Sequence, residues 1–413
     1  MKKKWDKSVW SLLAILGGAS VQAGEAVGVD SLAAALQEGE IGLSFRLRHE
    51  QVADDVFARD ANASTLRGRL SWNSAPWRGW ELAAEVDHVA YLFDGRYNDT
   101  RNGKTGFPVV VDPTGTDLNR FSLGWQGEQV SVVAGRQRIL LDNQRFVGGV
   151  GWRQNEQTYD ALRLALQPLT ELQIDYTWVE DTRRIFGPER GTPPASLDSD
   201  HHLLNIAWRP GEAIGLTGYA YQLDFGREAP GLSSRTLGGY LLGRVALDGL
   251  LADELVLDYR LELARQEDAG NNPVKYSAGF SHLGAGLSWR GWRLGVAREV
   301  LGADRDAGVA LQTPLATLHA FQGWADKFLS TPAAGLEDRF VGVSGQLAGV
   351  TLQATWHHYQ ADTGDSTFGR EWNLQASRQF AGRYTLTLKY ADYRADDFSR
   401  DTRKLWLVAE AGF

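Results

Sequence analysis

Apolar and polar residues alternate along most of this chain. Residues 41–48 read Ile-Gly-Leu-Ser-Phe-Arg-Leu-Arg, and residues 384–390 read Tyr-Thr-Leu-Thr-Leu-Lys-Tyr. Because successive side chains of a strand point to opposite faces, each such segment predicts a strand with one apolar and one polar face. The pattern recurs in about eighteen segments. They span residues 40–50, 63–73, 78–92, 116–126, 129–140, 157–167, 169–182, 200–209, 214–225, 233–247, 252–266, 277–290, 291–301, 336–348, 349–361, 368–380, 382–394 and 402–413.

The connections between these segments alternate in length. Short ones at 74–76, 127–128, 209–211 and 381–382 are separated by long ones at 93–115, 141–156, 183–199, 302–335 and 395–401. Strands of about ten residues joined in this way are typical of outer-membrane barrels. Residues 40–413 therefore predict an all-β fold, a transmembrane antiparallel β-barrel of about 18 strands with short periplasmic turns and long extracellular loops. Residues 316–324 are assigned to a long loop, because a further strand there would make the strand number odd.

The N-terminal residues predict export. Residues 1–23 combine a lysine-rich start, a short apolar run and the ending Val-Gln-Ala, which is typical of a signal peptide. Residues 24–39 are expected to form a short periplasmic segment, with a helical turn near 30–38. Export and a barrel together predict the outer membrane of a Gram-negative bacterium, with lipid against the apolar faces. The terminal Phe413 is expected to be read by the barrel-assembly machinery.

Composition removes several other classes of protein. The chain has no cysteine, which excludes a disulfide framework, a thiolate metal site and a cysteine nucleophile. A formal charge of −8 argues against a protein devoted to nucleic acid. A soluble β-solenoid or large sandwich remains the alternative, but its rows of Leu, Tyr and Trp would need a second layer to cover them.

The polar faces are expected to line the lumen, and they carry many charges. Arginine rings favour anions in pores, while pairing between neighbouring strands would only stiffen the wall, and both interpretations stay open. The basic positions are Arg46, Arg48, Arg67, Arg69, Arg120, Arg136, Arg138, Arg163, Arg244, Arg260, Arg293 and Lys389. The acidic positions are Glu81, Glu85, Asp87, Asp175, Asp258, Glu262, Glu371 and Glu410.

Two segments contain distinctive sequence motifs in addition to the alternating pattern. Residues 135–161 include Gly-Arg-Gln-Arg-Ile-Leu-Leu-Asp-Asn-Gln-Arg-Phe, and residues 313–329 include Leu-His-Ala-Phe-Gln-Gly-Trp-Ala-Asp-Lys-Phe. Both resemble stretches of the alginate export porin family. The resemblance implies an 18-strand barrel whose arginine-lined conduit passes a polyuronate and whose extracellular loops gate it. Arg136 and Arg138 match basic positions of the first motif. The residues of the loops that would narrow the mouth are Arg145, Arg153, His319, Trp324 and Lys327.

The resulting functional hypothesis is a channel for an anionic polysaccharide, with export of alginate or a related polyuronate as the main interpretation. Loop 141–156 or loop 302–335 would then gate the pore. An uptake porin for small anions or carboxylates is the first alternative. A barrel with a plugged lumen and an adhesive or structural role is the second.

Catalytic and metal chemistry find little support. Ser281 and His282 are adjacent on a strand and so face opposite ways, and the segment around Ser344 lacks the glycine spacing of a nucleophile elbow. We therefore expect neither an enzyme nor a bound cofactor. Acidic loop residues form groups that could hold Ca²⁺, although solvated loop charge is the interpretation that we prefer. These groups are Asp304 and Asp306, Asp362 and Asp365, and Asp396, Asp397 and Asp401.

Overall fold

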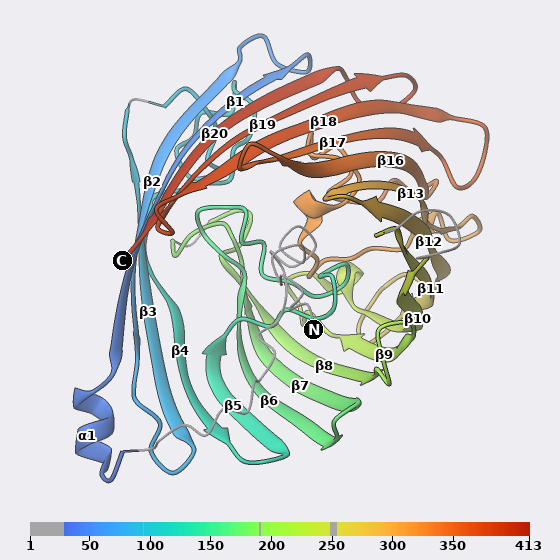
Figure 1. Ribbon diagram of the computed structural model, residues 1–413. Helices are drawn as coiled ribbons and strands as arrows, with labels where there is room; N and C mark the ends of the chain where they lie inside the picture. Colours follow the sequence, from blue (N-terminus) through green and yellow to red (C-terminus); the bar gives the residue numbers. More distant parts are fainter. Residues whose placement is uncertain (1–28, 94, 190, 248–253) are drawn as a thin grey trace.

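A closed antiparallel sheet of 18 strands forms the protein in the computed structural model (Figure 1). The structure describes residues 29–93, 95–189, 191–247 and 254–413, so the predicted signal peptide lies outside the described residues. The first nine strands are β1 (Glu40–Asp54), β2 (Ala61–Asn73), β3 (Trp80–Tyr91), β4 (Gly115–Gln126), β5 (Val130–Gln137), β6 (Thr158–Leu169), β7 (Leu172–Arg183), β8 (Ser196–Trp208) and β9 (Gly215–Leu223). The second nine are β10 (Ser234–Ala246), β11 (Val256–Asp268), β12 (Ser277–Trp289), β13 (Trp292–Leu301), β16 (Leu336–Leu347), β17 (Val350–Gln360), β18 (Thr367–Phe380), β19 (Tyr384–Ala395) and β20 (Thr402–Gly412).

The first and last strands close the sheet. β1 pairs with β20 in antiparallel register from Ser44 opposite Gly412 to Asp54 opposite Thr402. Leu43 and Phe413 exchange two backbone hydrogen bonds, of 3.1 and 2.8 Å, beyond the end of that ladder. Closure leaves the 18-strand sheet without a free edge that could pair with another chain. The predicted barrel and its strand number are confirmed.

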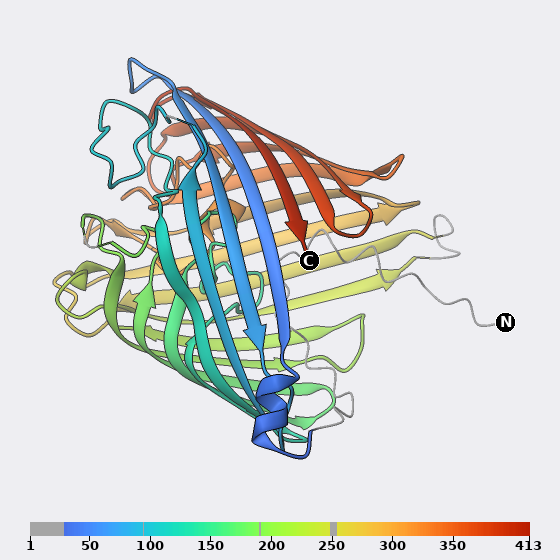
Figure 2. The same cartoon turned by 90° about the vertical axis from the view of Figure 1, so that its left-hand side faces the viewer.

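The two ends of the barrel differ, as the loop lengths predict. Short connections such as 348–349 and 381–383 lie at one end, and long ones such as 92–114 and 302–335 lie at the other. Figure 2 shows the tilted strands with the long loops gathered at one end. The helix α1 (Leu32–Gln37) begins at the N-cap Ser31, whose hydroxyl accepts the N–H of Ala34 at 3.1 Å. It lies at the short-turn end, where Ala75 N–H donates to the carbonyl of Ala35.

The outer face of the barrel is apolar. Ile41 and Leu263 are at least 70% exposed, whereas Arg48 on the opposite face of β1 is 1% exposed. An apolar surface of this extent is stable only against lipid, which explains why the alternation runs through nearly every strand. Within the described residues, no helix is long and apolar enough to cross a membrane.

The long connection 302–335 contains no barrel strand, as expected. It carries the small hairpin β14 (Ala303–Asp304) and β15 (Val309–Ala310) and the 3-10 helix η3 (Leu318–Ala320). A second 3-10 helix, η2 (Pro230–Leu232), lies in the connection from β9 to β10. The predicted strand at 129–140 is too long, because β5 ends at Gln137. This early end decides where the next side chains point.

Candidate substrate channel

Two loops fold into the barrel and contact each other. They are residues 138–157, between β5 and β6, and residues 302–335, between β13 and β16. Val147 and Leu315 form a parallel bridge, and both are buried. Gly148 N–H donates to the Leu315 carbonyl at 2.8 Å, and Thr317 Oγ1 lies 2.7 Å from Gln144 Oε1. The segments that the sequence singled out are therefore joined to one another inside the lumen.

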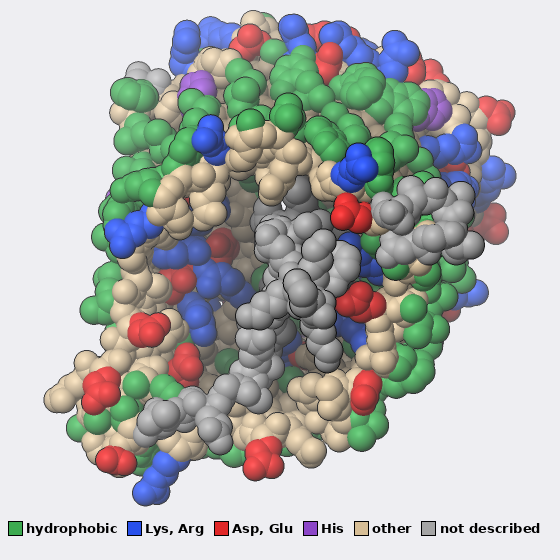
Figure 3. Space-filling view, in the orientation of Figure 1, with side chains coloured by type: hydrophobic (Ala, Val, Ile, Leu, Met, Phe, Trp, Pro, Cys, Tyr) green, Lys and Arg blue, Asp and Glu red, His purple; other side chains and the backbone are tan. Residues whose placement is uncertain are grey.

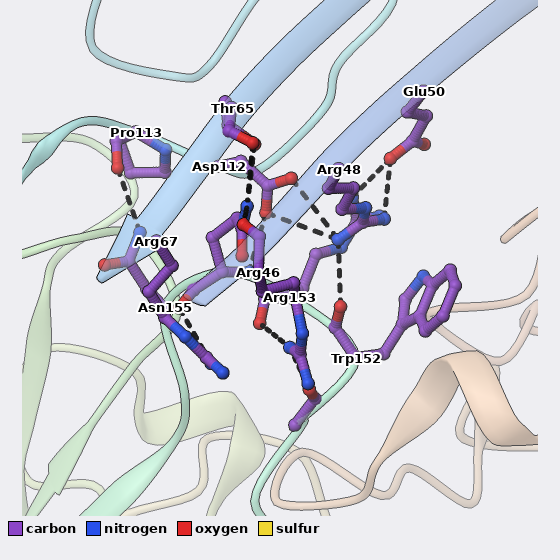
Figure 4. Close-up of polar contacts among 12 residues, drawn as sticks. Arg46, Arg48, Glu50, Thr65, Arg67, Asp112, Pro113, Trp152, Arg153 and Asn155 are labelled. Atoms are coloured by element: carbon purple, nitrogen blue, oxygen red, sulfur yellow. Dashed lines mark hydrogen bonds and ion pairs between the residues drawn. The ribbon is translucent and has the colours of Figure 1, made fainter. Parts of the chain in front are cut away.

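Arginines of the wall hold the first of these loops in place (Figure 4). Arg46 Nη1 donates to the Gly151 carbonyl at 2.8 Å, and Arg48 Nη1 donates to the Trp152 carbonyl at 2.9 Å. Arg48 Nη2 also lies 2.7 Å from Glu50 Oε2. These two arginines bind backbone carbonyls of the loop. They therefore hold the loop inside the barrel, where it narrows the lumen.

A second group joins β2, β3 and the loop, which we call the arginine–glutamate cluster: Arg67, Arg69, Arg138, Glu85 and Glu156. Glu156 receives Arg138 Nε at 2.6 Å, Arg69 Nη2 at 2.9 Å and Arg67 Nη1 at 3.7 Å. Glu85 is bound by Arg138 and, at 3.2 Å, by Arg69 Nε. Burial alone would raise the pKa of Glu156, but the three arginines outweigh it and hold that pKa well below its usual range.

Arg120 differs from these arginines. It lies opposite Glu85 in the β3–β4 register and shares its face with the buried Ser122. The charged groups that act on it are Arg138, Glu85 and Glu81, yet among the described residues no carboxylate comes within 4.0 Å of its guanidinium. Arg120 is thus a lumen cation that no side chain of the described chain neutralises directly.

The remaining wall cations form ion pairs at several levels of the barrel. Arg163 Nη2 lies 2.5 Å from Asp175, Arg260 Nη2 lies 2.6 Å from Glu262, and Arg293 Nη2 lies 2.6 Å from Asp258. Arg244 faces Asp258 in the β10–β11 register. The structure therefore shows the pairing between neighbouring strands, while anion selectivity of the lumen cations stays a prediction.

In several of these ion pairs the arginine side chain is more exposed than the carboxylate side chain. Arg138 is 26% exposed against 9% for Glu156, and Arg163 is 28% exposed against 6% for Asp175. Arg69 and Arg260 likewise cover carboxylates that are more deeply buried. The order reverses near the short-turn end, where Glu410 is more exposed than its partner Arg46. In the middle of the channel the guanidinium is the group that meets the lumen, and Figure 3 shows Lys and Arg side chains within the visible hollow.

Five side chains meet in one buried site, which we call the loop anchor: Lys389, His319, Asp326, Arg153 and Lys404. Lys389, His319 and Arg153 were predicted from the sequence, and Asp326 and Lys404 were not. His319 Nδ1 lies 2.7 Å from Asp326 Oδ1, and Lys389 Nζ lies 2.7 Å from His319 Nε2. These partners fix the neutral tautomer, with the proton on Nδ1 and Nε2 accepting from the ammonium. Asp326 Oδ2 also receives Lys404 Nζ at 2.7 Å and Arg153 Nη2 at 3.3 Å.

Electrostatics of the loop anchor agree with this tautomer. Burial lowers the pKa of His319 to about 3, which leaves the ring neutral at physiological pH. Burial alone would raise the pKa of Asp326, but its contacts with His319, Lys404 and Arg153 hold that pKa well below the usual range.

Indole rings surround the ammonium of Lys389. Its Nζ lies 3.7 Å from the ring centroid of Trp324 and 4.2 Å from that of Trp152, and Trp152 stacks on His319 at 5.0 Å. Cation–π attraction of this kind is strongest where water is excluded. Lys389 and Trp324 therefore anchor the loops to β19 and do not stand free in the lumen.

The other two loop residues also form anchors. Arg145 is almost fully buried, with Nε 2.9 Å from Glu299 and its guanidinium 4.8 Å from the ring centroid of Phe321. Lys327 Nζ lies 2.8 Å from Asp54 Oδ2 at the end of β1. The sequence analysis did not identify Asp326, Glu156 or Glu50. The carboxylates of these residues form ion pairs with arginines that it did identify.

Arg136 corrects the predicted lumen set. It lies opposite Phe121, which is 58% exposed on the outer face, and its guanidinium contacts Asp160 at 2.7 Å. Arg138 has the same parity but turns inward, because β5 ends at Gln137 and the chain leaves the sheet. Alternation assigns a face only while the strand continues.

The acidic loops make backbone contacts. Asp304 accepts the N–H of Ser277 at 2.9 Å and that of Ala307 at 3.1 Å, and Asp401 accepts the N–H of Ala395 at 2.9 Å. In the described part of the chain, no group of three His, Asp or Glu residues is arranged to hold a metal ion. The suggested Ca²⁺ sites are absent from these residues.

The fold defines the class of protein, an 18-strand β-barrel of the outer membrane. No family model matches the chain, and no curated protein matches it. Solved structures match closely in fold. Acinetobacter baumannii OccAB2 aligns at a TM-score of 0.72 with 12% identity, over 92% of this chain and 99% of that chain. OccAB1 of the same species aligns at a TM-score of 0.70 with 12% identity, over 95% of this chain and 99% of that chain. Pseudomonas aeruginosa OpdK with vanillate aligns at a TM-score of 0.68 with 13% identity, over 92% of this chain and 99% of that chain.

These comparisons correct the family and the cargo expected from the sequence. The chain is similar in structure to proteins named Occ and Opd, of which OpdK was solved with vanillate, and the resemblance to the alginate export family is wrong. Export of a polyuronate, the main functional interpretation, is wrong with it. Alternation is a property of any transmembrane β-barrel, so it does not specify the cargo.

Proposed function

We propose that this protein is a passive channel that admits small anionic solutes, carboxylates among them, across the outer membrane. The observation that carries the proposal is the order of exposure in the middle of the channel, where Arg138 and Arg163 are more exposed than the carboxylates that they pair with. A solute passing there meets guanidinium groups, which bind carboxylates through two parallel hydrogen bonds. The proposed activity is conduction and includes no chemical step.

The joined loops support a small solute. Residues 138–157 and 302–335 occupy the lumen and are fixed to the wall by Arg46, Arg48 and the loop anchor. A lumen narrowed in this way favours solutes of small cross-section. Pseudomonas aeruginosa OpdK was solved with vanillate, a small aromatic carboxylate, and that is the chemistry we extend to this chain.

Arg120 supplies the sharpest test. Because no carboxylate of the described residues pairs with it directly, Arg120→Gln removes a lumen charge without leaving a buried acid unpaired. We expect anion preference, measured as the reversal potential of the reconstituted channel in a salt gradient, to fall by about half or more, since charged rings set pore selectivity. Arg120→Glu should lower it further.

Arg136→Gln is the matched control, because it removes the same charge from the outer face of the adjacent strand. It should leave the reversal potential unchanged. The proposal fails if Arg120→Gln and Arg136→Gln change selectivity equally, or if the unmodified channel prefers cations.

A further inference from the structure

Basic side chains form a row across the outer surface of the barrel. We call Arg298, Arg339, His358, Arg370 and Arg394 the outer basic row. In the strand registers, Arg298 lies opposite Arg339, Arg339 opposite His358, His358 opposite Arg370, and Arg370 opposite Arg394. Paired residues of antiparallel strands share a face, so five neighbouring strands, β13 and β16–β19, present these side chains to one side.

That side faces the membrane near the long-loop end. Arg339 shares its face with Val341 and Val343, and Arg370 shares its face with the exposed Trp372. Arg298 and Arg394 lie close to the ends of β13 and β19 where the long loops begin. The row therefore lies just above the apolar belt, at the level of the lipid headgroups of the outer leaflet. Figure 3 shows charged side chains, many of them basic, along the rim over these strands.

The row carries a charge conflict that the protein compensates only in part. Like charges directly opposite each other destabilise a sheet, because neighbouring strands lie about 4.8 Å apart. Glu337 lies 2.5 Å from Arg298 and also contacts Arg339. Arg394 lies 3.0 Å from both Asp392 and Asp401. Among the described residues, no carboxylate lies within 4.0 Å of Arg370 or His358.

Outside this row, the outward-facing charges at the long-loop end include carboxylates that offset the basic groups. On β10 and β11, Arg235 and Arg265 share Glu267. At the same end of β6 and β8, the outward-facing charges are Asp160, paired with Arg136, and Asp200, which accepts from Trp178 Nε1 at 2.9 Å. Three arginines of the row, Arg298, Arg339 and Arg394, are about half exposed, so their guanidinium groups remain accessible.

We propose that the outer basic row binds the phosphate groups of an outer-leaflet lipid, and that this lipid is lipopolysaccharide, through its phosphorylated lipid A. Guanidinium forks bind phosphate oxygens in pairs, and a row spaced by the strand separation presents several such forks to one headgroup. Trp356 and Trp372 lie on the same face of β17 and β18, where aromatic rings favour the membrane interface. The row lies outside the lumen, so the inference is independent of what the channel conducts.

The test is binding of lipid A to the folded, detergent-solubilised barrel, measured by native mass spectrometry. The variant Arg339→Gln/Arg370→Gln should bind bisphosphorylated lipid A at least about tenfold more weakly, since each basic side chain at an anionic surface contributes separately. The matched control is Arg290→Gln/Arg383→Gln, which removes two exposed arginines from the short turns at the other end. It should bind lipid A as the unmodified protein does.

Dephosphorylated lipid A separates phosphate recognition from acyl-chain binding. It should bind weakly to all three proteins. Equal binding of lipid A to the row variant and the unmodified barrel, or equal binding of the two lipids to the unmodified barrel, would overturn the inference. If the double variant does not fold, Arg370→Gln alone provides the same comparison, because it breaks no ion pair of the described residues. Single-channel conductance should be the same in all variants.

Discussion

At the scale of single residues, arginines that look alike in the sequence lie in three different environments. Arg46 and Arg48 hold loop carbonyls, Arg120 stands without a direct ion pair among the described residues, and Arg136 lies on the outer face. Sequence alternation predicted the face of most of them, since each lies within a regular strand. It could not predict their partners, because Glu156 and Asp326 come from loops that no periodic pattern places.

His319 makes the stability of the barrel depend on pH. Its pKa is about 3 in the folded protein because it is buried, whereas an unfolded histidine has a pKa of about 6.5. Between these values the unfolded state binds the proton and the folded state does not, so stability falls as the pH is lowered, by up to about 1.4 kcal/mol per pH unit. Asp326 and Glu156 have lowered pKa values, so their stabilisation is present above pH of about 4 and is lost only below it.

Between pH 6.5 and pH 5 we therefore expect the midpoint temperature of unfolding to decline less steeply for His319→Gln than for the unmodified protein. The midpoint is measured from the shift in gel mobility that heating produces. His88→Gln is the control, because His88 lies on an outer face beside Thr116. If the unmodified protein and His319→Gln lose stability with the same slope, the buried histidine is not the titrating group.

At the scale of elements, strands and loops differ in how far the sequence determines them. Each strand carries its own alternating pattern, so the ranges predicted for β3 and β19 agree with the structure within a few residues. The inward course of residues 138–157 depends on contacts with residues 302–335, which are remote in sequence. Their local sequences predicted only that they are long loops.

Gly323 tests how the second loop is held. Its φ is +79°, and a Cβ there would collide with the Tyr359 hydroxyl and the Glu371 carboxylate. That carboxylate accepts the N–H groups of Trp324 at 2.6 Å and Ala325 at 2.8 Å. We expect Gly323→Ala to displace residues 321–326 from the wall and to change the single-channel conductance and increase its fluctuations.

Gly308→Ala is a matched control, because Gly308 has a φ of +66° but open space around its Cβ position. Both substitutions place alanine in a strained backbone conformation, and only the first disturbs the wall contact. Identical conductance traces for the two variants would mean that the contact with Glu371 does not hold the loop.

At the scale of the whole molecule, the architecture was predictable and the cargo was not. The count of alternating segments and the exclusion of residues 316–324 predicted an even, closed barrel, because lipid demands an apolar outer face and a sheet without edges. The two segments chosen for their resemblance are indeed the loops that meet in the lumen. Their cargo was misassigned, because the strand pattern of a barrel does not determine what passes through it and the lumen takes its shape only when the loops pack.

The most direct test of the central claim is solute flux through the purified barrel in liposomes. We expect small carboxylates such as vanillate or benzoate to enter faster than neutral analogues of the same size, and polymannuronate to remain outside. Entry of the neutral analogues at the same rate, or passage of the polymer, would contradict the account of a narrow channel for small anions.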